Sequence, residues 1–349
     1  MAEKYKQILT KLELRLRQMR SDGVTRLPSE QDLAKEYACS RQTVRAALDI
    51  LQQKGLIVKK TGAGSFIADK AFANRTIFFM TEDIDKYTTP SIIAELKTAL
   101  SQHKFELEAF STNGKIAGEA RVLDQVIKER PAALIIDPVK DLIPNPNNRT
   151  IEEIIGSGIP VIYYNSTFTP AGAIRVTPDN KKGSSILVHK LADMGKKNIA
   201  CIFRMDDSSG LDRYLGYIDA LAEFDLPYDE HHCLLLSYKD KKGSLMGNDR
   251  IISQYAAIVT SGVDAVICQN DMVAHDLADI LSRKGVKIPQ DITIASFDNS
   301  YYAASDTRFS SLGLAEGFPA KAIAKSAVAA AEGRSVRDVI IPWAEEKQV

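Results

Sequence analysis

The stretch that decides the fold runs from residue 27 to residue 67 and reads LPSEQDLAKEYACSRQTVRAALDILQQKGLIVKKTGAGSFI. This pattern predicts two short helices joined by a turn, followed by a two-stranded hairpin with a basic, glycine-rich tip. Ser29 and Asp32 resemble a capping box with Asp in place of Glu, and Ser40 can cap the second helix. Gly55 suits the end of that helix.

A further helix is expected before this stretch, because apolar residues recur at helical spacing from Tyr5 to Met19. In the second helix of the stretch, Val44, Leu48 and Leu51 form the predicted buried stripe. The polar and basic side chains of that helix lie away from the stripe, near its N-terminus. A recognition helix carries its base-reading residues at that end.

The side chains at this end of the helix suit contacts with duplex DNA. Arginine can form bidentate bonds with guanine and glutamine with adenine, and hydroxyl groups can reach phosphates or base edges. A hairpin tip of small residues flanked by lysines can lie in a minor groove or along phosphates. Each piece alone also fits an ordinary surface helix or hairpin turn, so the prediction depends on their order and spacing. The residues concerned are Ser40, Arg41, Gln42, Thr43, Arg45, Lys59 and Lys60.

Residues 4–67 resemble the winged helix-turn-helix domain of the GntR family of bacterial transcription regulators. The resemblance rests on the Leu-Pro-Ser-Glu motif at 27–30, the Ser-Arg-x-Thr-Val-Arg motif at 40–45 and the Gly-x-Gly-Ser-Phe motif at 62–66. Family members commonly carry Arg or Glu where this chain has Gln31. The resemblance implies contacts with operator DNA at Gln31, Ser40, Arg41, Gln42, Thr43, Arg45 and the hairpin around Gly62.

The distribution of charge supports a division of the chain. Residues 1–68 hold 13 Lys and Arg against 7 Asp and Glu, a net charge of +6, whereas the remaining residues carry −6. The zero net charge of the whole chain therefore hides a basic head and an acidic body. Such asymmetry indicates nucleic-acid binding by the head.

At 349 residues, with 45% of them hydrophobic, the chain is long enough for about two or three globular cores. It shows no charged and then apolar leader and no run of about 18 apolar residues. We therefore expect a cytoplasmic protein without a membrane segment. The expected division is a head at 1–68, a linker at 69–75 and a body at 76–349.

The four cysteines, Cys39, Cys201, Cys233 and Cys268, are scattered and form no Cys-x-x-Cys motif. This pattern favours reduced thiols over a disulfide or zinc framework. The nearest approach to a metal cluster is the His-His-Cys run at 231–233, whose adjacent side chains point in different directions and rarely ligate one ion. We expect neither a metal nor another cofactor.

The body alternates strands and helices, which is typical of parallel sheets covered by helices on both faces. The predicted strands are Thr76–Met80, Phe105–Phe110, Ala133–Ile136, Val161–Tyr164, Ile199–Phe203, Cys233–Leu236, Ala265–Cys268 and Ile292–Ala295. The predicted helices include Ser91–Gln102, Ala117–Glu129, Asn180–Met194, Leu211–Glu223, Arg250–Ser261 and Asp271–Lys284. So many strands exceed one unit, and we expect an α/β fold with two similar lobes. Ligands of open parallel sheets bind at the carboxyl ends of strands, where Asp137 and Arg204 lie.

The body resembles the effector domain of LacI/GalR-type repressors, which is related to periplasmic sugar-binding proteins. The clearest motifs are Arg-Tyr-Leu-Gly-Tyr at 213–217, Gln-Asn-Asp-Met-Val-Ala at 269–274 and Asp-Ile-Thr-Ile-Ala-Ser-Phe-Asp at 291–298. The resemblance implies an inter-lobe cleft in which Asn165, Arg213, Asn270 and Asp298 bind ligand hydroxyls. It divides the lobes into 76–178 with 309–327, and 179–308 with 328–349. A GntR-type head on a LacI-type body resembles the arabinose-responsive repressors.

A sugar presents hydroxyls that both donate and accept, together with apolar ring faces. Asp, Asn and Arg at strand ends can supply charge-assisted bonds, and Tyr87, Tyr164, Tyr214 or Phe318 can stack on the ring. The alternatives are core packing for an aromatic residue, an inter-lobe ion pair for the Arg and Asp, and a helix cap for the Asn, which is compatible with ligand contact. The residues expected at the effector site are Asn165, Arg213, Asn270, Asp298, Tyr87, Asp137 and Arg204.

These expectations combine into an allosteric repressor. A homodimer would present two heads to a pseudo-palindromic operator, and a ligand would close the lobes by a hinge motion. A coupling free energy of about 1–3 kcal/mol would change operator affinity about 5- to 150-fold. Release of DNA on ligand binding is the more common family behaviour, and a pentose such as L-arabinose is expected from the domain pairing alone.

Two other classes of function are an α/β enzyme with an accessory DNA-binding head and an architectural DNA binder. The chain lacks a Gly-x-Ser-x-Gly elbow, a Walker loop and metal-ligand spacing, and nothing pairs its aspartates with a nucleophile. We therefore expect no catalytic residue. A sensor would return its sugar unchanged, and an architectural protein would show no ligand-dependent stability.

Overall fold

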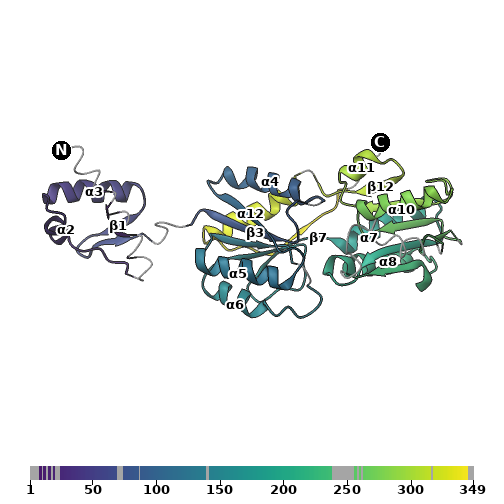
Figure 1. Cartoon of the computed structure of the whole chain (residues 1–349), viewed down its shortest axis with the longest axis horizontal. Coiled ribbons are helices and arrows are strands. Elements are labelled where there is room, and N and C mark those ends of the chain that lie inside the picture. The colour runs from purple at the N-terminus through teal and green to yellow at the C-terminus, as the bar shows by residue number, and fades with distance from the viewer. Residues whose placement is uncertain are drawn as a thin grey trace. The chain divides into compact units, whose positions relative to one another are not determined.

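The computed structural model describes residues 8–9, 11–12, 15–16, 19, 24–68, 74–85, 87–138, 141–237, 255–257, 259–260, 262–315 and 317–344. The chain divides into two compact units, Met1–Asn74 and Arg75–Val349. Figure 1 draws the first unit in purple and the second from blue to yellow. The boundary falls within the predicted linker, of which residues 69–73 lie outside the described part.

The head has the architecture of a winged helix-turn-helix. Its elements are α2 (Glu30–Glu36), α3 (Arg41–Gln53) and the antiparallel strands β1 (Ile57–Lys60) and β2 (Gly64–Ile67). Apolar residues from all of them close one core, together with helical residues of the predicted N-terminal helix. The buried members are Ile8, Leu12, Leu16, Leu27, Leu33, Ala34, Val44, Ala47, Leu48, Leu51, Ile57 and Ile67.

Both predicted N-caps of the head are present. Ser29 Oγ accepts a bond from the backbone N–H of Asp32, and Ser40 Oγ accepts one from Thr43, each at 3.2 Å. The Asp32 carboxylate in turn accepts a bond from the Ser29 hydroxyl at 2.6 Å, which fixes the capping side chain. Gly55 follows α3 with φ 69°, a left-handed conformation that glycine adopts at little cost. The local sequence therefore sets where both helices begin and where α3 ends.

The first lobe of the body is a parallel sheet with strand order β13-β7-β6-β5-β3-β4. These strands are β3 (Thr76–Thr81), β4 (Glu106–Ser111), β5 (Ala133–Ile136), β6 (Val161–Tyr164), β7 (Ile174–Pro178) and β13 (Val339–Ile341). On one face lie α4 (Thr89–Ser101) and α12 (Ala320–Ala331), and on the other α5 (Ile116–Glu129) and α6 (Asn148–Gly156) (Figure 1). Strand β5 is apolar and buried along its length because helices cover both faces.

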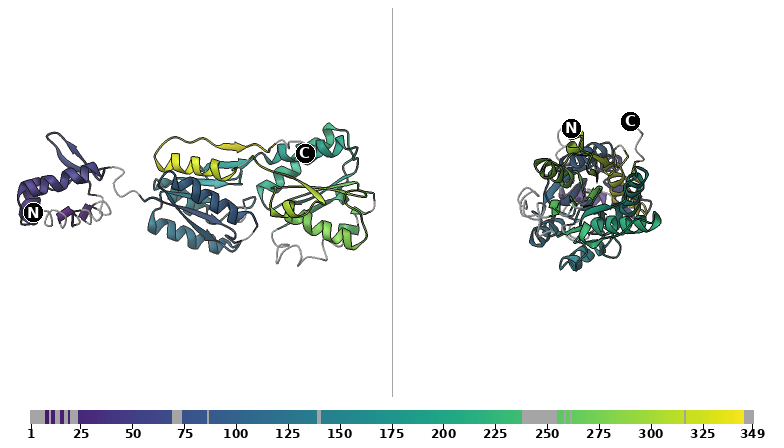
Figure 2. Two further views of the ribbon diagram at one scale, coloured as in Figure 1. Left: turned by 90° about the horizontal axis from the view of Figure 1, so that it is seen from above. Right: turned by 90° about the vertical axis from the view of Figure 1, so that its right-hand side faces the viewer.

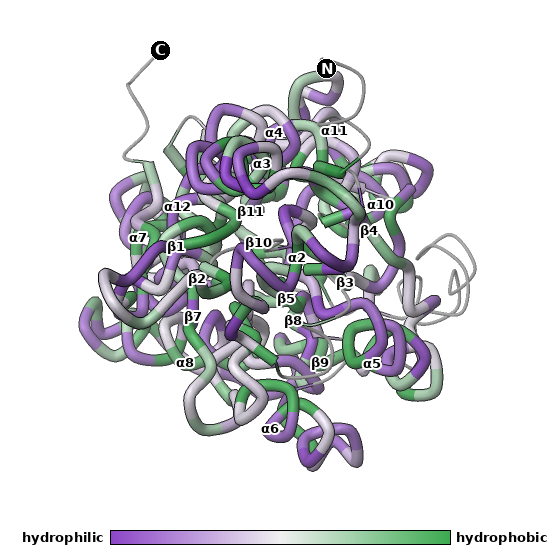
Figure 3. The backbone as a smooth tube through the Cα atoms, turned by 90° about the vertical axis from the view of Figure 1, so that its left-hand side faces the viewer, coloured by the Kyte–Doolittle hydropathy of each residue, from purple (hydrophilic) through white to green (hydrophobic). Residues whose placement is uncertain are grey.

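The second lobe is a parallel sheet with strand order β12-β11-β10-β8-β9. These strands are β8 (Ile199–Arg204), β9 (Cys233–Leu236), β10 (Ala265–Cys268), β11 (Thr293–Phe297) and β12 (Phe309–Leu312). One face is covered by α7 (Asn180–Asp193) and α8 (Ser208–Glu223), and the other by α10 (Asp271–Arg283) and α11 (Tyr301–Ser305) (Figure 2). Along the helices in Figure 3, hydrophilic and hydrophobic residues alternate, as expected for one exposed and one buried side.

All eight predicted strands are present, as are the predicted helices that become α4, α5, α7, α8 and α10. The predicted helix Arg250–Ser261 lies largely outside the described residues. Among the described residues, the elements that were not predicted include β7, β13, α6, α11 and α12.

The predicted division of the C-terminal residues between the lobes was wrong in two places. Residues 309–312 form β12, which pairs with β11 and so belongs to the second lobe. Residues 328–331 end α12 on the first sheet, and β13 pairs in parallel with β7 at the edge of that sheet. The first lobe therefore takes its last helix and its last strand from the end of the chain.

The chain crosses between the lobes at three places, and backbone hydrogen bonds tie the crossings together. The crossings follow β7, β12 and β13. Asp179 N–H donates to the carbonyl of Ile341 at 3.0 Å, and Ala344 N–H donates to that of Gly313 at 2.9 Å. Any movement of one lobe against the other therefore passes through one bundle of bonded segments.

Gly216 allows α8 to pack closely on α7. A Cβ at this position would lie 2.1 Å from the carbonyl oxygen of Lys181, far inside van der Waals contact. We expect Gly216→Ala to lower the free energy of unfolding by about 1–3 kcal/mol, because the backbone must move to relieve the clash. Gly156→Ala is the matched control, since a Cβ there meets nothing within 4 Å. Denaturant titration measures both, and equal effects would contradict the close approach.

Candidate functional site

The N-terminal end of α3 presents polar side chains to solvent. Arg41 and Gln42 are exposed and have no side-chain partner within the described part of the chain, and Gln31 is exposed on α2. Ser40 and Thr43 share a hydroxyl–hydroxyl bond of 2.8 Å, so the cap also orients the Thr43 hydroxyl. The structure thus places Ser40, Arg41, Gln42 and Thr43 together at the N-terminal end of α3, with Gln31 on α2.

Arg45 is held by a carboxylate from the neighbouring helix. Its Nε lies 3.3 Å from Glu30 Oε1 and its Nη2 lies 3.1 Å from Glu30 Oε2, a bidentate arrangement. The hydrogen bond with Glu30 and its negative charge raise the pKa of Arg45. The Arg45 side chain is nevertheless 64% exposed, so the guanidinium is oriented without being buried.

The hairpin carries the predicted lysines on β1. Lys59 Nζ forms an ion pair of 2.5 Å with Asp49 on α3, and Lys60 Nζ lies 5.0 Å from the centre of the Phe66 ring. Gly62, in the turn between the strands, has φ 76°, which a side chain would strain. Lys60 and the turn at Gly62 are exposed, whereas Lys59 joins the hairpin to α3.

In the body, polar side chains from both lobes gather at the carboxyl ends of the strands. Asp137 follows β5 and accepts a bond from Thr81 at the end of β3, at 2.9 Å. Tyr164 ends β6, and burial raises the pKa of its hydroxyl, with further contributions from the carboxylates of Asp137 and Asp298. The Tyr164 hydroxyl therefore remains neutral and near carboxylates of both lobes.

Arg213 is the most heavily bonded side chain of this group. It is 5% exposed, and its Nε donates to Asn180 Oδ1 at 2.9 Å, while Nη1 donates to the carbonyl of Gln269. Its Nη2 lies 3.7 Å from Asp298 Oδ1, and its guanidinium carbon lies 4.1 Å from the centre of the Phe297 ring. A guanidinium fixed on several sides is preorganised to receive hydroxyl groups.

Asp298 connects this arginine to the other lobe. The Tyr87 hydroxyl donates to Asp298 Oδ2 at 2.8 Å and accepts from the backbone N–H of Asp271 at 3.3 Å. Burial raises the pKa of Asp298, which the nearby Arg213 lowers and Asp271 raises, and the net result is a raised pKa. Tyr87 follows β3 in the first lobe, so this bond spans the two lobes.

A second contact between the lobes lies at the start of α8. Asn165 Oδ1 accepts a bond from Ser209 Oγ at 2.7 Å. Asp141 of the first lobe accepts bonds from the backbone N–H of Ser208, at 2.8 Å, and from the Ser208 hydroxyl. Asp141, Ser208 and Ser209 were not predicted as site residues. The two serines could have been found from the local sequence, because Asp207 caps α8 and the helix begins at Ser208, before the predicted start at Leu211.

Arg204 at the end of β8 already has acidic neighbours. It forms ion pairs with Asp206, at 3.3 Å, and with Asp207. Burial lowers the pKa of Arg204, but the carboxylates of Asp207, Asp206, Glu82 and Asp137 outweigh burial and the net pKa is raised. Both arginines at the strand ends, Arg204 and Arg213, thus have carboxylate partners within the protein.

Three predicted site residues have left-handed backbone conformations. The φ values are 54° for Tyr87, 59° for Asn165 and 98° for Asp298. Such conformations are uncommon for residues with a Cβ and gather at functional sites. Asn270 instead has an extended backbone and caps α10, accepting from Val273 N–H at 3.1 Å. Tyr214, an aromatic alternative, bonds the hydroxyl of Tyr228 at 2.8 Å.

Two parts of the chain match known protein families. Residues 77–307 match the family described as periplasmic binding protein domain. The chain belongs to this family. Residues 4–67 match the bacterial regulatory proteins of the gntR family, so a GntR-type head precedes the periplasmic-binding-protein body.

Two relatives of this periplasmic-binding-protein chain align with 82% of its length. The arabinose metabolism transcriptional repressor of Halalkalibacterium halodurans is 29% identical over 296 residues, covering 82% of this chain and 78% of the relative. The repressor of the same name from Geobacillus stearothermophilus is 28% identical, covering 82% and 79%. The alignments are therefore longer than the body alone.

Solved structures share the fold of the periplasmic-binding-protein body. The transcription regulator CcpA of Lactococcus lactis superposes with a TM-score of 0.68 at 17% identity, covering 78% of this chain and 97% of that one. A periplasmic binding protein/LacI transcriptional regulator from Alkaliphilus metalliredigens, complexed with D-xylulofuranose, gives 0.65 at 18% identity, covering 77% and 96%. These likenesses establish the two-lobed architecture.

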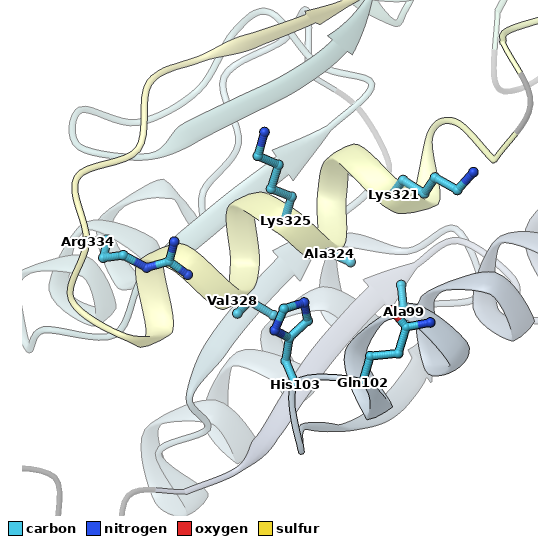
Figure 4. Close-up of a pocket in the computed structure, with 8 residues that line it drawn as sticks. All are labelled: Ala99, Gln102, His103, Lys321, Ala324, Lys325, Val328 and Arg334. Carbon is cyan, nitrogen blue, oxygen red and sulfur yellow. The ribbon is translucent and has the colours of Figure 1, made fainter.

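A cavity of about 360 Å³ lies elsewhere on the first lobe, between α4 and α12 (Figure 4). Its walls carry basic and polar side chains over a floor of alanine and valine. The lining residues are Ala99, Gln102, His103, Lys321, Ala324, Lys325, Val328 and Arg334. The polar side chains at the strand ends are called the strand-end group below, and its members are Tyr87, Asp137, Asn165, Arg204, Arg213 and Asp298. The cavity shares no residue with this group, so its lysines provide control positions for experiments on the group.

Within the residues that the structure describes, no group of His, Cys, Asp and Glu is arranged to hold a metal ion. Among the same residues, no helix has both the length and the apolar character needed to cross a membrane. All four cysteines are free thiols.

Proposed function

We propose that this chain is a sequence-specific DNA-binding repressor of carbohydrate-utilisation genes, released from its operator when a small sugar binds between the lobes. The observation that carries the proposal is the combination of a GntR-type head with a sugar-binding type of body in one chain. The exposed start of α3 and the polar strand ends are the surfaces that we assign to DNA and to the sugar. Two relatives that align with 82% of this chain are named as arabinose metabolism transcriptional repressors.

Operator recognition is assigned to the start of α3 and to the hairpin. Gln31, Arg41, Gln42 and Arg45 supply donors that can read base edges in a major groove. The residues assigned to phosphates and to positioning are Ser40, Thr43, Lys59, Lys60 and Gly62. A homodimer would present two such heads, which matches a pseudo-palindromic operator.

The strand-end group suits an uncharged polyol. Asn165, Arg213, Asp298 and Asp137 offer both donors and acceptors, as hydroxyl groups require. Because Arg204 and Arg213 are already paired with carboxylates, a phosphate or carboxylate ligand would have to displace these partners. L-arabinose is the first candidate, since two relatives are named for arabinose metabolism.

The bonds between the lobes provide the means of transmission. A sugar between the strand ends would compete for the hydroxyl of Tyr87 and the amide of Asn165, which now bond Asp298 and Ser209. Replacement of these bonds would change the angle between the lobes, with the three crossings as the hinge. A ligand shifts such an equilibrium only by its difference in affinity for the two conformations.

Thermal unfolding of the full chain tests the proposal directly. L-arabinose at about 100 times its dissociation constant should raise the free energy of unfolding by about 2.7 kcal/mol. For a domain of this size that corresponds to a rise in Tm of about 5 °C or more. Ribose 5-phosphate, a phosphorylated pentose, should give no comparable rise. A greater rise with the phosphate would contradict the assigned cleft chemistry, and no rise with any free sugar would remove the sensor function.

A second measurement separates a sensor from an enzyme. After prolonged incubation with the protein, the stabilising sugar should be recovered unchanged, because a sensor releases its ligand without chemical change. Chromatography of the sugar before and after incubation checks this. Conversion at a rate proportional to protein concentration would assign catalysis to the body instead.

A further inference from the structure

Trp343 is the one tryptophan of the chain, and it lies where the chain crosses between the lobes for the third time. It follows β13, the edge strand of the first lobe, yet its side chain packs in the core of the second lobe. Only 6% of the residue is exposed. A large side chain thus passes from one lobe into the other at the hinge.

Trp343 contacts the other two crossings. Its indole N–H donates to the carbonyl of Asp179, in the first crossing, at 2.8 Å. Its backbone forms an antiparallel bridge with Leu314, in the second crossing. One residue therefore joins all three segments that must rotate when the lobes move.

The indole also lies beside the arginine of the strand-end group. The guanidinium carbon of Arg213 is 5.5 Å from the centre of the Trp343 ring, and the Phe297 ring is 5.2 Å from the same ring. Arg213 and Phe297 are themselves 4.1 Å apart, and Phe297 directly precedes Asp298. The two rings therefore back the pair formed by Arg213 and Asp298, through cation–π contact.

The packing around the indole leaves it little freedom. A Cβ on Gly183 of α7 would lie 2.5 Å from the indole Nε1, so glycine is needed for the ring to occupy its position. The hydrogen bond with Asp179 fixes the nitrogen edge of the ring, and Gly183 of α7 lies against the same edge. Movement of the indole consequently requires movement of the crossings or of Arg213.

From these contacts we infer that Trp343 is a positioning residue that holds Arg213 for the sugar and links its position to the hinge. The inference rests on the proposed function, since it assigns a role toward the sugar of the same cleft. It gives a merely apolar core position a defined part in transmitting ligand binding to the heads. The emission of this tryptophan should report the event.

The experiment compares the full-length wild type with Trp343→Phe and Trp343→Leu, using L-arabinose as the probe. In the wild type, saturation should change the intensity or wavelength of the tryptophan emission. Trp343→Leu should lower sugar affinity about 10-fold or more, because the guanidinium loses one of its two ring partners and the indole no longer holds the hinge beside it. Trp343→Phe should keep affinity within about 3-fold but weaken the release of operator DNA, because the bond to Asp179 is lost.

The controls separate this role from simple stability. Without sugar, the tryptophan emission of the Arg213→Gln and Gly183→Ala variants should differ from that of the wild type. The emission of Lys325→Ala, in the distant cavity, should match the wild type. If L-arabinose raises the Tm of the wild type but leaves emission unchanged, and Trp343→Leu keeps wild-type affinity, the inference is overturned and the proposed function stands. If no free sugar raises the Tm of the wild type, both are overturned.

Discussion

Replacing Arg45 with alanine should abolish specific operator binding while leaving the body folded and able to bind sugar. A bidentate arginine–guanine contact contributes about 1–3 kcal/mol of discrimination, and a dimer would lose it in both half-sites. Operator affinity should therefore fall about 100-fold or more. Gel-shift titration measures the affinity, and sugar-dependent Tm confirms that the body is intact.

Lys54→Ala is the matched control for this substitution. Lys54 follows the same helix at its C-terminal end, so the variant loses one positive charge without touching the recognition end. We expect a small change in affinity that is the same for specific and unrelated DNA, because a phosphate contact positions without reading sequence. Equal losses in the two variants, on operator and on unrelated DNA alike, would remove α3 from its assigned role.

The second large effect is expected at Arg213. Arg213→Ala leaves the carboxylate of Asp298, which is 25% exposed, without its cation and leaves Asn180 Oδ1 without its donor. Removal of one partner from a fully buried ion pair costs about 3–5 kcal/mol of stability, and solvent at Asp298 reduces that cost here, so the Tm should fall. Sugar affinity should fall about 100-fold or more, because the ligand loses a charge-assisted donor. Operator binding, measured well below the Tm, should persist and no longer respond to sugar.

Two further variants make this result interpretable. Arg213→Lys keeps the charge without the planar fork, and it should recover stability better than sugar affinity. Asp298→Ala removes the acceptor of Tyr87 and should also abolish the response to sugar. If both Arg213→Ala and Asp298→Ala release operator DNA at wild-type sugar concentrations, the strand-end group is not the effector site.

Local signals predicted the elements whose formation depends on their own residues. Ser29 and Ser40 cap helices because a hydroxyl accepts from an N–H two or three residues ahead, which needs no distant partner. Buried strands such as Ala133–Ile136 stand out as short apolar runs, and their predicted ends agree with the structure. Such local signals predicted almost all of the helices and strands of the head.

The sequence did not predict the elements and contacts that depend on residues far away in the chain. Strand β13 has three residues and forms because β7 offers an edge, and α12 is rich in alanine with little periodic contrast. The assignment of β13 and of residues 328–331, the end of α12, to the first lobe therefore requires the three-dimensional path of the chain. The bond between Tyr87 and Asp298 joins residues 211 positions apart through two left-handed conformations, which no local pattern reveals.

In the proposed complex with the operator, Glu30 would compete with each base for the Arg45 guanidinium, because the two residues already form a bidentate pair. To bind guanine, Arg45 would exchange the two carboxylate oxygens of Glu30 for the two acceptor atoms of the base. Guanine would therefore replace both hydrogen bonds that the arginine gives up. A base edge with a single acceptor recovers less, and the arginine then stays with Glu30. Selectivity at this position would then come from the competing Glu30 pair as well as from attraction to DNA. An encounter with the wrong sequence would leave Arg45 paired with Glu30.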